Sequence, residues 1–349
     1  GDPPMKALIL HGVRDVRLRD IPEPRPGPRQ VKVRIRAVGI CGSDVHYYKH
    51  GRIGEVVVEA PIVAGHEAAG EVAELGEGVE GLEVGQRVAI EPGRSCGVCE
   101  WCLAGRPNLC PDVQFRSTPP VDGLMCEFAV LDAHQCLPVP DALSFEEAAM
   151  LEPLQVSVHA VNLMGTVPGE TAAVVGAGCI GLGCMEVAKV GGAARIIVTD
   201  KLGYRLDLAR QLGATDTVNV SEEDPAEAVQ RLTDGRGADV VFECSNRAAG
   251  APQAYDLAAI GGRVGLIGIP EEDEIILDAH DPRRKELRIQ YVHRSRDAAQ
   301  QAVPLLATGQ VDVASWITHR VGLADARQVF ETVADYADGV LKAVVLPNE

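Results

Sequence analysis

Positive charge and long apolar runs are both scarce in this sequence of 349 residues. Its 33 lysines and arginines face 50 aspartates and glutamates, which gives a net charge of −17. Such an excess of acid argues against a surface for nucleic acid or for an anionic membrane. The longest stretch without a charged residue, residues 153–169, contains Gln155, Asn162 and Pro168 and is no credible membrane span. We therefore expect neither a nucleic-acid partner nor a membrane partner.

A signal peptide, internal repeats and low-complexity tracts are also missing. Residues 1–4, which precede Met5, resemble a remnant of cloning and are left out of the fold prediction. We expect a cytoplasmic protein, in which the ten cysteines are metal ligands or buried thiols and not disulfides. Because a domain usually holds roughly 100–200 residues, the length of the chain predicts two domains.

The first half of the chain is rich in strand signals. From residue 31 to residue 38, apolar and basic side chains alternate, which indicates a strand with one buried face. Further short strands are predicted at residues 70–75, 87–91 and 126–131, separated by turns rich in glycine and proline. Irregular strands with glycine corners suggest a small, distorted barrel.

From about residue 155, strands and helices alternate. Helices are predicted at residues 182–190 and 204–212, and each ends at a glycine. The alternation predicts a parallel sheet with helices on both faces. Two more helical stretches are expected after residue 292. The strands predicted in this half are residues 171–175, 195–199, 217–220, 239–242, 263–268, 287–292 and, at the end of the chain, 342–346.

A glycine motif lies between a predicted strand and a predicted helix. Its sequence, Gly176-Ala177-Gly178-Cys179-Ile180-Gly181, matches G-x-G-x-x-G. The glycines permit a tight turn and let the backbone approach a pyrophosphate at a helix N-terminus, where free N–H groups favour negative charge. Asp200 ends the next strand and is placed to accept hydrogen bonds from an adenosine ribose, which favours NAD over NADP. The alternative is a purely structural glycine turn in a flavodoxin-like sheet.

Four cysteines form a second motif, with the spacing C-x2-C-x2-C-x7-C. Four thiolates so close in sequence suit a closed, tetrahedral zinc site, which takes up no substrate and stabilises a loop. One alternative is a pair of disulfides, which a reducing compartment disfavours. Another is a nucleic-acid zinc ribbon, which the scarcity of basic residues disfavours. The four residues are Cys96, Cys99, Cys102 and Cys110.

A third group of metal-binding residue types lies at the ends of predicted strands in the first domain. Cys41 follows one strand, and His66 and Glu67 precede another. A cysteine, a histidine and a carboxylate can hold zinc with one position open for water or substrate, as a catalytic site requires. The plainer alternative is a buried thiol and a histidine with an ordinary surface role.

Taken together, the motifs resemble the zinc-dependent medium-chain alcohol dehydrogenases. The resemblance runs from Lys6 to the end of the chain and is carried by residues 39–47 and 65–67, the four cysteines, the glycine motif and Asp200. Residues 115–123 and 151–154 are similar to the branch of sorbitol (L-iditol) and xylitol dehydrogenases.

The resemblance implies an α/β protein of two domains. A GroES-like, β-rich catalytic domain would comprise residues 5–154 and be completed by residues 295–349. A doubly wound Rossmann domain that binds NAD would comprise residues 155–294.

The resemblance also implies two zinc ions per chain, a structural one at the four cysteines and a catalytic one. Cys41, His66 and Glu67 would hold the catalytic zinc together with a water. Glu152 would be an alternative third ligand or a base beside the metal. Asp44 would bind the far nitrogen of His66 and fix its tautomer.

Further roles follow from the same resemblance. The proton of the alcohol would leave through the zinc-bound water with Glu152, or through Ser43 and His46. The residues implied to line the polyol site are Tyr47, Phe115, Glu152 and Arg294. The residues implied to contact the cofactor are Gly176, Gly178, Cys179, Ile180, Gly181, Asp200, Arg205, Ile267, Gly268, Ile269, Val292, His293 and Arg294.

The implied reaction moves a hydride from a secondary hydroxyl of a polyol to NAD and gives a ketose. Alternatives are the same chemistry on a butanediol, threonine or an aldose, and a non-catalytic NAD(H)-binding protein on the same fold. His293 and Ser295 stand where sorbitol dehydrogenases usually have aromatic residues, and the four-cysteine motif resembles microbial relatives. The resemblance further implies a homo-oligomer, either a tetramer or a dimer.

Overall fold

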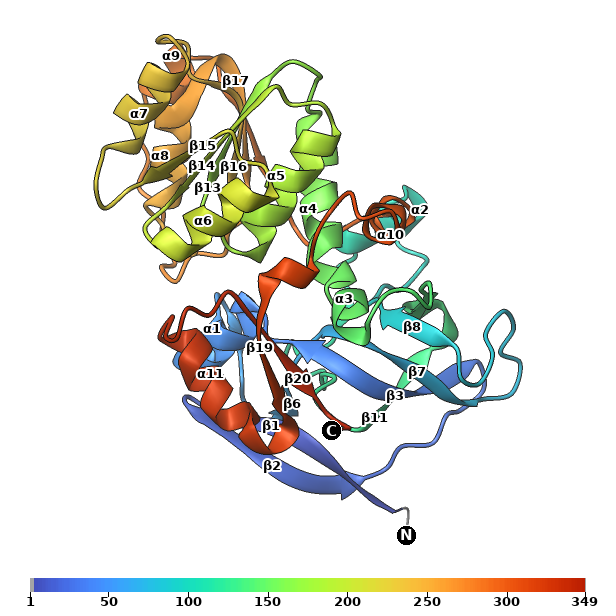
Figure 1. Ribbon diagram of the computed structural model, residues 1–349. Helices are drawn as coiled ribbons and strands as arrows, with labels where there is room; N and C mark the ends of the chain where they lie inside the picture. The colour runs from blue at the N-terminus through green and yellow to red at the C-terminus, as the bar shows by residue number, and fades with distance from the viewer. Residues whose placement is uncertain (1–2, 349) are drawn as a thin grey trace. The chain divides into compact units, whose positions relative to one another are not determined.

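The computed structural model describes residues 3–348 and divides into two compact units (Figure 1). Unit 1 combines the chain up to Glu152 with the segment from Val313 onward, and unit 2 is Pro153–Asp312. Unit 1 is mainly β-structure, whereas unit 2 alternates strands and helices. The predicted pairing of a β-rich domain with an α/β domain is therefore confirmed.

The predicted domain boundary after residue 294 is wrong, because residues 295–312 belong to unit 2. This segment includes helix α10 (Ala299–Ala307), in which Gln301 accepts a hydrogen bond from Asn162 at 3.1 Å. The N–H of Asp312 donates to the carboxylate of the buried Glu186 at 2.9 Å. Both contacts tie the segment to helices of unit 2. The first boundary lies after Glu152 and not after residue 154.

The largest sheet of unit 1 has seven strands, and the last strand of the chain completes it. Along the sheet the strands are β12 (Cys136–Pro138), β8 (Arg87–Ile90), β7 (Glu67–Leu75), β3 (Gln30–Gly39), β20 (Lys342–Leu346) and β19 (Ile317–Gly322), with β11 (Phe128–Asp132) also paired to β3. Burial alternates along most of β3, as the sequence predicts. Strand β20 runs antiparallel to β3, so Val344 and Val345 pair with Gly39 and Val38.

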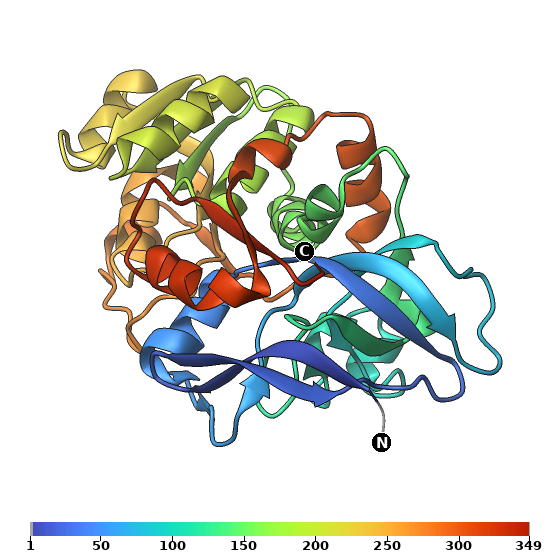
Figure 2. The ribbon, with the colours of Figure 1, turned by 60° about the horizontal axis from the view of Figure 1, so that its bottom comes forward.

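The remaining strands of unit 1 form separate small sheets, so the pairing is not continuous around one barrel. These strands are β1 (Pro4–Gly12), β2 (Asp15–Pro22), β4 (Arg52–Ile53), β5 (Val56–Val57), β6 (Ile62–Val63), β9 (Gly93–Arg94) and β10 (Gln114–Phe115). Figure 2 shows the long antiparallel ribbon of β1 and β2. Pro4, excluded as part of a remnant, pairs with Pro22 at the start of β1, because the extended backbone there suits proline. Gly1 and Asp2 lie outside the described residues.

The helices of unit 1 are short, and the first of them lies at the predicted metal site. They are α1 (Gly42–His50), α2 (Glu100–Leu103), α3 (Phe145–Ala149) and α11 (Ala326–Ala334). Helix α1 begins directly after Cys41, which has an extended backbone, and Asp44 in the first turn accepts the N–H of Cys41 at 3.1 Å. The helix ends at Gly51, which adopts a left-handed φ of 70°.

Unit 2 has a sheet of six parallel strands. The strand order is β15 (Asp216–Asn219), β14 (Arg195–Asp200), β13 (Thr171–Val175), β16 (Ala238–Glu243), β17 (Ala258–Leu266) and β18 (Arg288–Tyr291). The chain adds strands outward from β13 in one direction and then, from β16, in the other. The order therefore reverses between β13 and β16, where doubly wound sheets bind ligands beyond the carboxyl ends of the strands.

Every strand predicted in this half is present, although the ends differ by several residues at β17. The helices that contribute to unit 2 are α4 (Leu151–Met164), α5 (Cys179–Val190), α6 (Gly203–Leu212), α7 (Pro225–Leu232), α8 (Gly250–Leu257), α9 (Asp281–Arg284) and α10. Within residues 3–348, no helix is both long enough and apolar enough to cross a membrane.

Candidate functional site

Three predicted zinc ligands, Cys41, His66 and Glu67, come together in unit 1. Their donor atoms all lie within 4.8 Å of one another. Cys41 precedes α1, whereas Glu67 begins β7 and pairs with Gly39 at the end of β3, so the sheet register brings the two segments side by side. A thiolate, an imidazole and a carboxylate form a donor set that suits zinc and leaves a coordination position for substrate. The residues therefore fit the predicted catalytic metal.

Asp44, which the resemblance implies to support His66, lies beside it. One carboxylate oxygen of Asp44 is 3.7 Å from Nδ1 of His66, and both side chains are buried. Burial alone would lower the pKa of His66, but the neighbouring charges of Asp44 and Cys41 outweigh it and raise the pKa well above its usual value. A carboxylate behind a metal-binding histidine fixes the orientation and tautomer of the ring.

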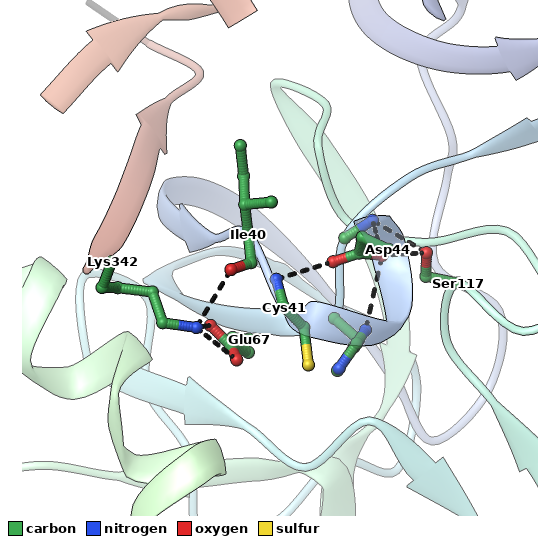
Figure 3. A network of polar contacts seen from close by, with 8 residues as sticks. Ile40, Cys41, Asp44, Glu67, Ser117 and Lys342 are labelled. Atoms are coloured by element: carbon green, nitrogen blue, oxygen red, sulfur yellow. Dashed lines mark hydrogen bonds and ion pairs between the residues drawn. The ribbon is translucent and has the colours of Figure 1, made fainter. Parts of the chain in front are cut away.

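Ser117 supports Asp44, a contact that no sequence pattern predicts. Its hydroxyl donates to Oδ1 of Asp44 at 2.8 Å (Figure 3) and accepts the N–H of Gly65 at 2.9 Å. Ser117 is buried and has a left-handed φ of 61°, an uncommon conformation for a serine. The segment 115–123 resembles polyol dehydrogenases, but nothing in its residue spacing points to a contact with Asp44.

A buried lysine from the last strand holds Glu67. Lys342 donates to the two carboxylate oxygens of Glu67 at 2.7 and 2.6 Å and to the carbonyl oxygen of Ile40 at 3.0 Å (Figure 3). Lys342 and Glu67 are only 5% and 1% exposed, so each buried charge is stabilised by the opposite charge of its partner. Nothing near Lys342 in the sequence points to this contact, because Lys342 lies 275 residues from Glu67. The ion pair fixes the carboxylate of Glu67 beside Cys41 and His66.

Glu152 stands in the first turn of α4 and is partly buried. Loss of hydration raises the pKa of its carboxyl group to about 7, an effect that the charges of Glu67 and Glu91 reinforce and those of His66 and Lys342 oppose. Among the described residues, the group of metal-binding donors includes Glu67 and does not include Glu152. A carboxyl group with a pKa near neutrality is suited to exchange protons with a substrate.

The other residues predicted near the metal also belong to unit 1. Ser43, His46 and Tyr47 lie on α1, and both His46 and Tyr47 are buried. The ring of Phe115 meets the ring of His66 edge to face, with 5.4 Å between the centroids. An aromatic ring against a metal-binding histidine is consistent with the predicted role of Phe115 in lining the substrate site. Arg294, the fourth predicted substrate contact, belongs to unit 2 and has a left-handed φ of 56°.

The four cysteines of the C-x2-C-x2-C-x7-C motif gather as predicted, and their sulfur atoms all lie within 4.8 Å of one another. The N–H groups of Cys96, Cys99 and Cys102 donate to sulfur atoms within the group at 3.3–3.5 Å. The backbone N–H groups of Val98 and Cys99 lower the pKa of Cys96 to about 7. Four sulfur atoms this close together fit a closed structural zinc site.

The glycine motif in unit 2 forms the predicted turn between β13 and α5. Gly176 has a left-handed φ of 91°, and Gly178 lies at the N-cap of α5. Asp200, at the end of β14, accepts the N–H of Ala177 at 2.7 Å on one carboxylate oxygen and that of Leu202 at 2.8 Å on the other. Each oxygen retains a lone pair, so Asp200 holds the glycine turn and can still accept a ribose hydroxyl.

The other predicted cofactor contacts follow strands of the same parallel sheet. Residues 267–269 come directly after β17 and residues 292–294 directly after β18. Because the carboxyl ends of parallel strands lie at one edge of the sheet, these segments share an edge with the glycine motif and Asp200. Arg205 lies on α6, the helix that follows Asp200.

Comparison with known proteins identifies relatives over the whole chain. The family model described as the alcohol dehydrogenase GroES-like domain matches residues 27–141, and the zinc-binding dehydrogenase model matches residues 179–308. A sorbitol dehydrogenase from Bacillus subtilis is 40% identical over 344 residues, which are 99% of this chain and 98% of the relative.

Two solved structures show the same fold. An Escherichia coli oxidoreductase of unknown specificity has a TM-score of 0.94 and 33% identity, and the match covers 99% of this chain and 100% of that chain. The 2R,3R-butanediol dehydrogenase of Bacillus subtilis has a TM-score of 0.89, 31% identity and the same coverage. The predicted combination of a GroES-like domain with a Rossmann domain is confirmed.

Proposed function

The chain belongs to the zinc-dependent medium-chain alcohol dehydrogenases, in the branch of the sorbitol dehydrogenases, and we propose that it oxidises a secondary hydroxyl of a polyol to a ketose with NAD. The observation that carries this proposal is the gathering of Cys41, His66 and Glu67 in a unit separate from a complete dinucleotide motif. A protein that only binds NAD(H) has no use for such an open zinc site.

Zinc bound at Cys41, His66 and Glu67 would act as a Lewis acid and lower the pKa of a substrate hydroxyl. Asp44, itself held by Ser117, keeps His66 in the orientation that a ligand needs. In the proposal Glu67 is the third ligand, because its carboxylate lies within the donor group while Glu152 lies outside it.

Glu152 is the proposed base. With a pKa of about 7, its carboxyl group can take up the hydroxyl proton near neutral pH and release it afterwards. Ser43 and His46 on α1 would provide a second route for the proton. Tyr47 and Phe115 would line the substrate site, and Arg294 would bind hydroxyls remote from the reacting carbon.

NAD is the proposed cofactor, in preference to NADP. A carboxylate at the end of β14 can accept hydrogen bonds from the ribose hydroxyls, whereas it repels a 2′-phosphate. We also propose a cytoplasmic location, since thiolate ligand sets persist in a reducing compartment.

A substrate panel tests the proposed function. Purified protein with NAD should oxidise sorbitol or xylitol with a higher kcat/KM than threonine, 2R,3R-butanediol or isopropanol, and the product should be a ketose. Arg294→Ala should lower kcat and raise KM for the polyol but leave isopropanol nearly unchanged, because isopropanol has no remote hydroxyls. Arg283→Ala, an exposed arginine on α9, is the matched control.

A higher kcat/KM for butanediol or threonine than for sorbitol and xylitol would refute the polyol assignment. The butanediol dehydrogenase among the structural relatives makes butanediol the strongest competitor. If Arg294→Ala lowers kcat/KM equally for sorbitol and for isopropanol, this arginine binds the cofactor or stabilises the fold.

We further propose that the protein is a homo-oligomer whose subunits meet at β18. This strand lies at the edge of the unit 2 sheet, and all four of its residues are exposed, including Ile289 and Tyr291. An exposed edge strand can pair with the same strand of a second copy about a twofold axis, which gives a dimer. A tetramer would need a second interface.

Light scattering after gel filtration tests the oligomer. The wild type should have a mass that is a multiple of 37.0 kDa. Replacing Ile289 and Tyr291 with lysine should shift the mass toward a single chain, because charges on an edge strand oppose pairing. Val84→Lys, at an exposed valine of unit 1, should leave the mass unchanged. A monomeric wild type, or an unaffected double variant, would exclude this interface.

A further inference from the structure

A buried glutamate lies at the centre of the unit 2 sheet, and none of the roles above uses it. Glu243 is the last residue of β16 and is only 4% exposed. Strand β16 pairs with β13, which leads into the glycine motif, and with β17 on its other side (Figure 1). Glu243 therefore lies at the carboxyl end of a strand that borders the reversal of strand order, where doubly wound folds bind their ligands.

The carboxylate of Glu243 joins two loops. One oxygen accepts the N–H of Ser245 at 2.8 Å and also the Ser245 hydroxyl. The backbone carbonyl of Glu243 accepts the N–H groups of Ile267 and Gly268 at 2.9 and 3.0 Å, and the N–H of Gly268 bonds the carboxylate as well. The residue thus ties the segment after β16 to the segment after β17.

At two positions the backbone lies so close to the carboxylate of Glu243 that only glycine fits. A Cβ on Gly250, at the start of α8, would lie 2.2 Å from a carboxylate oxygen of Glu243. A Cβ on Gly268 would lie 2.8 Å from the other oxygen. Both distances are far below van der Waals contact. The backbone at Ser245, Gly250 and Gly268 therefore encloses the carboxylate of Glu243.

The position of Glu243 relative to Asp200 indicates which half of a dinucleotide it affects. A doubly wound fold binds a dinucleotide with two halves of the sheet, one for each nucleotide. Asp200 is in the half formed by β13, β14 and β15, which also carries the glycine motif and so takes the adenosine side. Glu243 orders the loops of the other half, formed by β16, β17 and β18.

We propose that Glu243 is a positioning residue that holds the nicotinamide side of the cofactor site, by fixing Ser245 and Gly268 against each other. The inference rests on the proposed use of NAD. It gives the two carboxylates that end β14 and β16 separate tasks, since Asp200 orders the adenosine side and Glu243 the nicotinamide side. Glu243 acts through the backbone of its neighbours and touches no substrate in this proposal.

The affinities of the purified protein for NADH and for ADP, measured by calorimetry, distinguish the two sides of the cofactor site. ADP contains only the adenosine side. Glu243→Ala should weaken NADH about tenfold, the loss expected for one or two hydrogen bonds, and should change ADP binding less than about twofold. Glu243→Gln retains a carbonyl oxygen and should recover part of the NADH affinity. Asp200→Ser is the matched control and should weaken both ligands.

Three results would overturn the inference. Unchanged NADH binding by Glu243→Ala, equal weakening of NADH and ADP, or a rise in the KM for the polyol without a rise for NAD would each exclude it. A wild type that binds no NADH would instead refute the proposed function, so the two failures are distinguishable.

A second variant covers the case in which Glu243→Ala does not fold. Gly250→Ala places a methyl group against the intact carboxylate and should also weaken NADH and spare ADP. In a Glu243→Ala background that folds, the same methyl group no longer meets a carboxylate and keeps only its contact with the hydroxyl oxygen of Ser245 at 2.3 Å, so the two losses should be less than additive. An unaffected Gly250→Ala, or strictly additive losses, would contradict the proposal.

Discussion

Replacing Cys41 with serine should abolish dehydrogenase turnover while the chain stays folded. Cys41 is partly exposed at the start of α1 and supplies the only sulfur of the group formed with His66 and Glu67. Lewis-acid stabilisation by a catalytic metal contributes several kcal/mol, so its loss should reduce kcat by roughly a thousandfold or more. Metal analysis should show one zinc ion per chain where the wild type has two.

Cys99→Ser is the matched variant, because it removes a thiolate from the closed group of four cysteines. Zinc held by four protein ligands contributes to folding, whereas an open site contributes mainly to chemistry. Cys99→Ser should therefore lower the thermal midpoint and leave kcat of the folded protein nearly unchanged. Fully active wild-type protein with a single zinc, or a reversal of the two phenotypes, would refute the assignment of two zinc ions with separate roles.

Replacing Asp200 with serine should move the cofactor preference from NAD toward NADP. Hydrogen bonds to a charged group contribute about 1.5–3 kcal/mol, so the loss of the ribose contacts should weaken NAD use roughly 10- to 150-fold. Asp200 also holds the N–H groups of Ala177 and Leu202, which places the expected loss toward the upper end of that range. The nearby Lys201 and Arg205 would then be able to attract a 2′-phosphate.

The measurement is kcat/KM for NAD and NADP in both proteins. Asp207→Ser is a matched control, because Asp207 is an exposed carboxylate on α6 that pairs with Arg210. It should leave the ratio of the two efficiencies unchanged. A wild type that already prefers NADP, or an Asp200→Ser variant whose ratio does not move, would show that Asp200 does not bind the adenosine ribose.

Much of the fold and of the site could be predicted from local patterns in the sequence. The alternation at residues 31–38 predicts β3, and the glycine motif predicts the turn before α5, because both depend on neighbouring residues only. The four cysteines are likewise close enough in sequence to indicate one closed site. The catalytic group required the resemblance as well, since the spacing between Cys41 and His66 left an ordinary structural role open.

The residues that fix the site could be identified only from the tertiary structure. Lys342 and Glu67 lie 275 residues apart, and Ser117 and Asp44 lie 73 apart. Glu243 reaches Gly268 through strand pairing, and α10 joins unit 2 through contacts with helices distant in sequence. The periodicity of apolar residues indicates which face of a helix or strand is buried, but it does not indicate which other element packs against that face. Residue types and their local spacing therefore indicate the chemistry and the local elements, whereas the register of paired strands brings together the buried polar groups that hold the site.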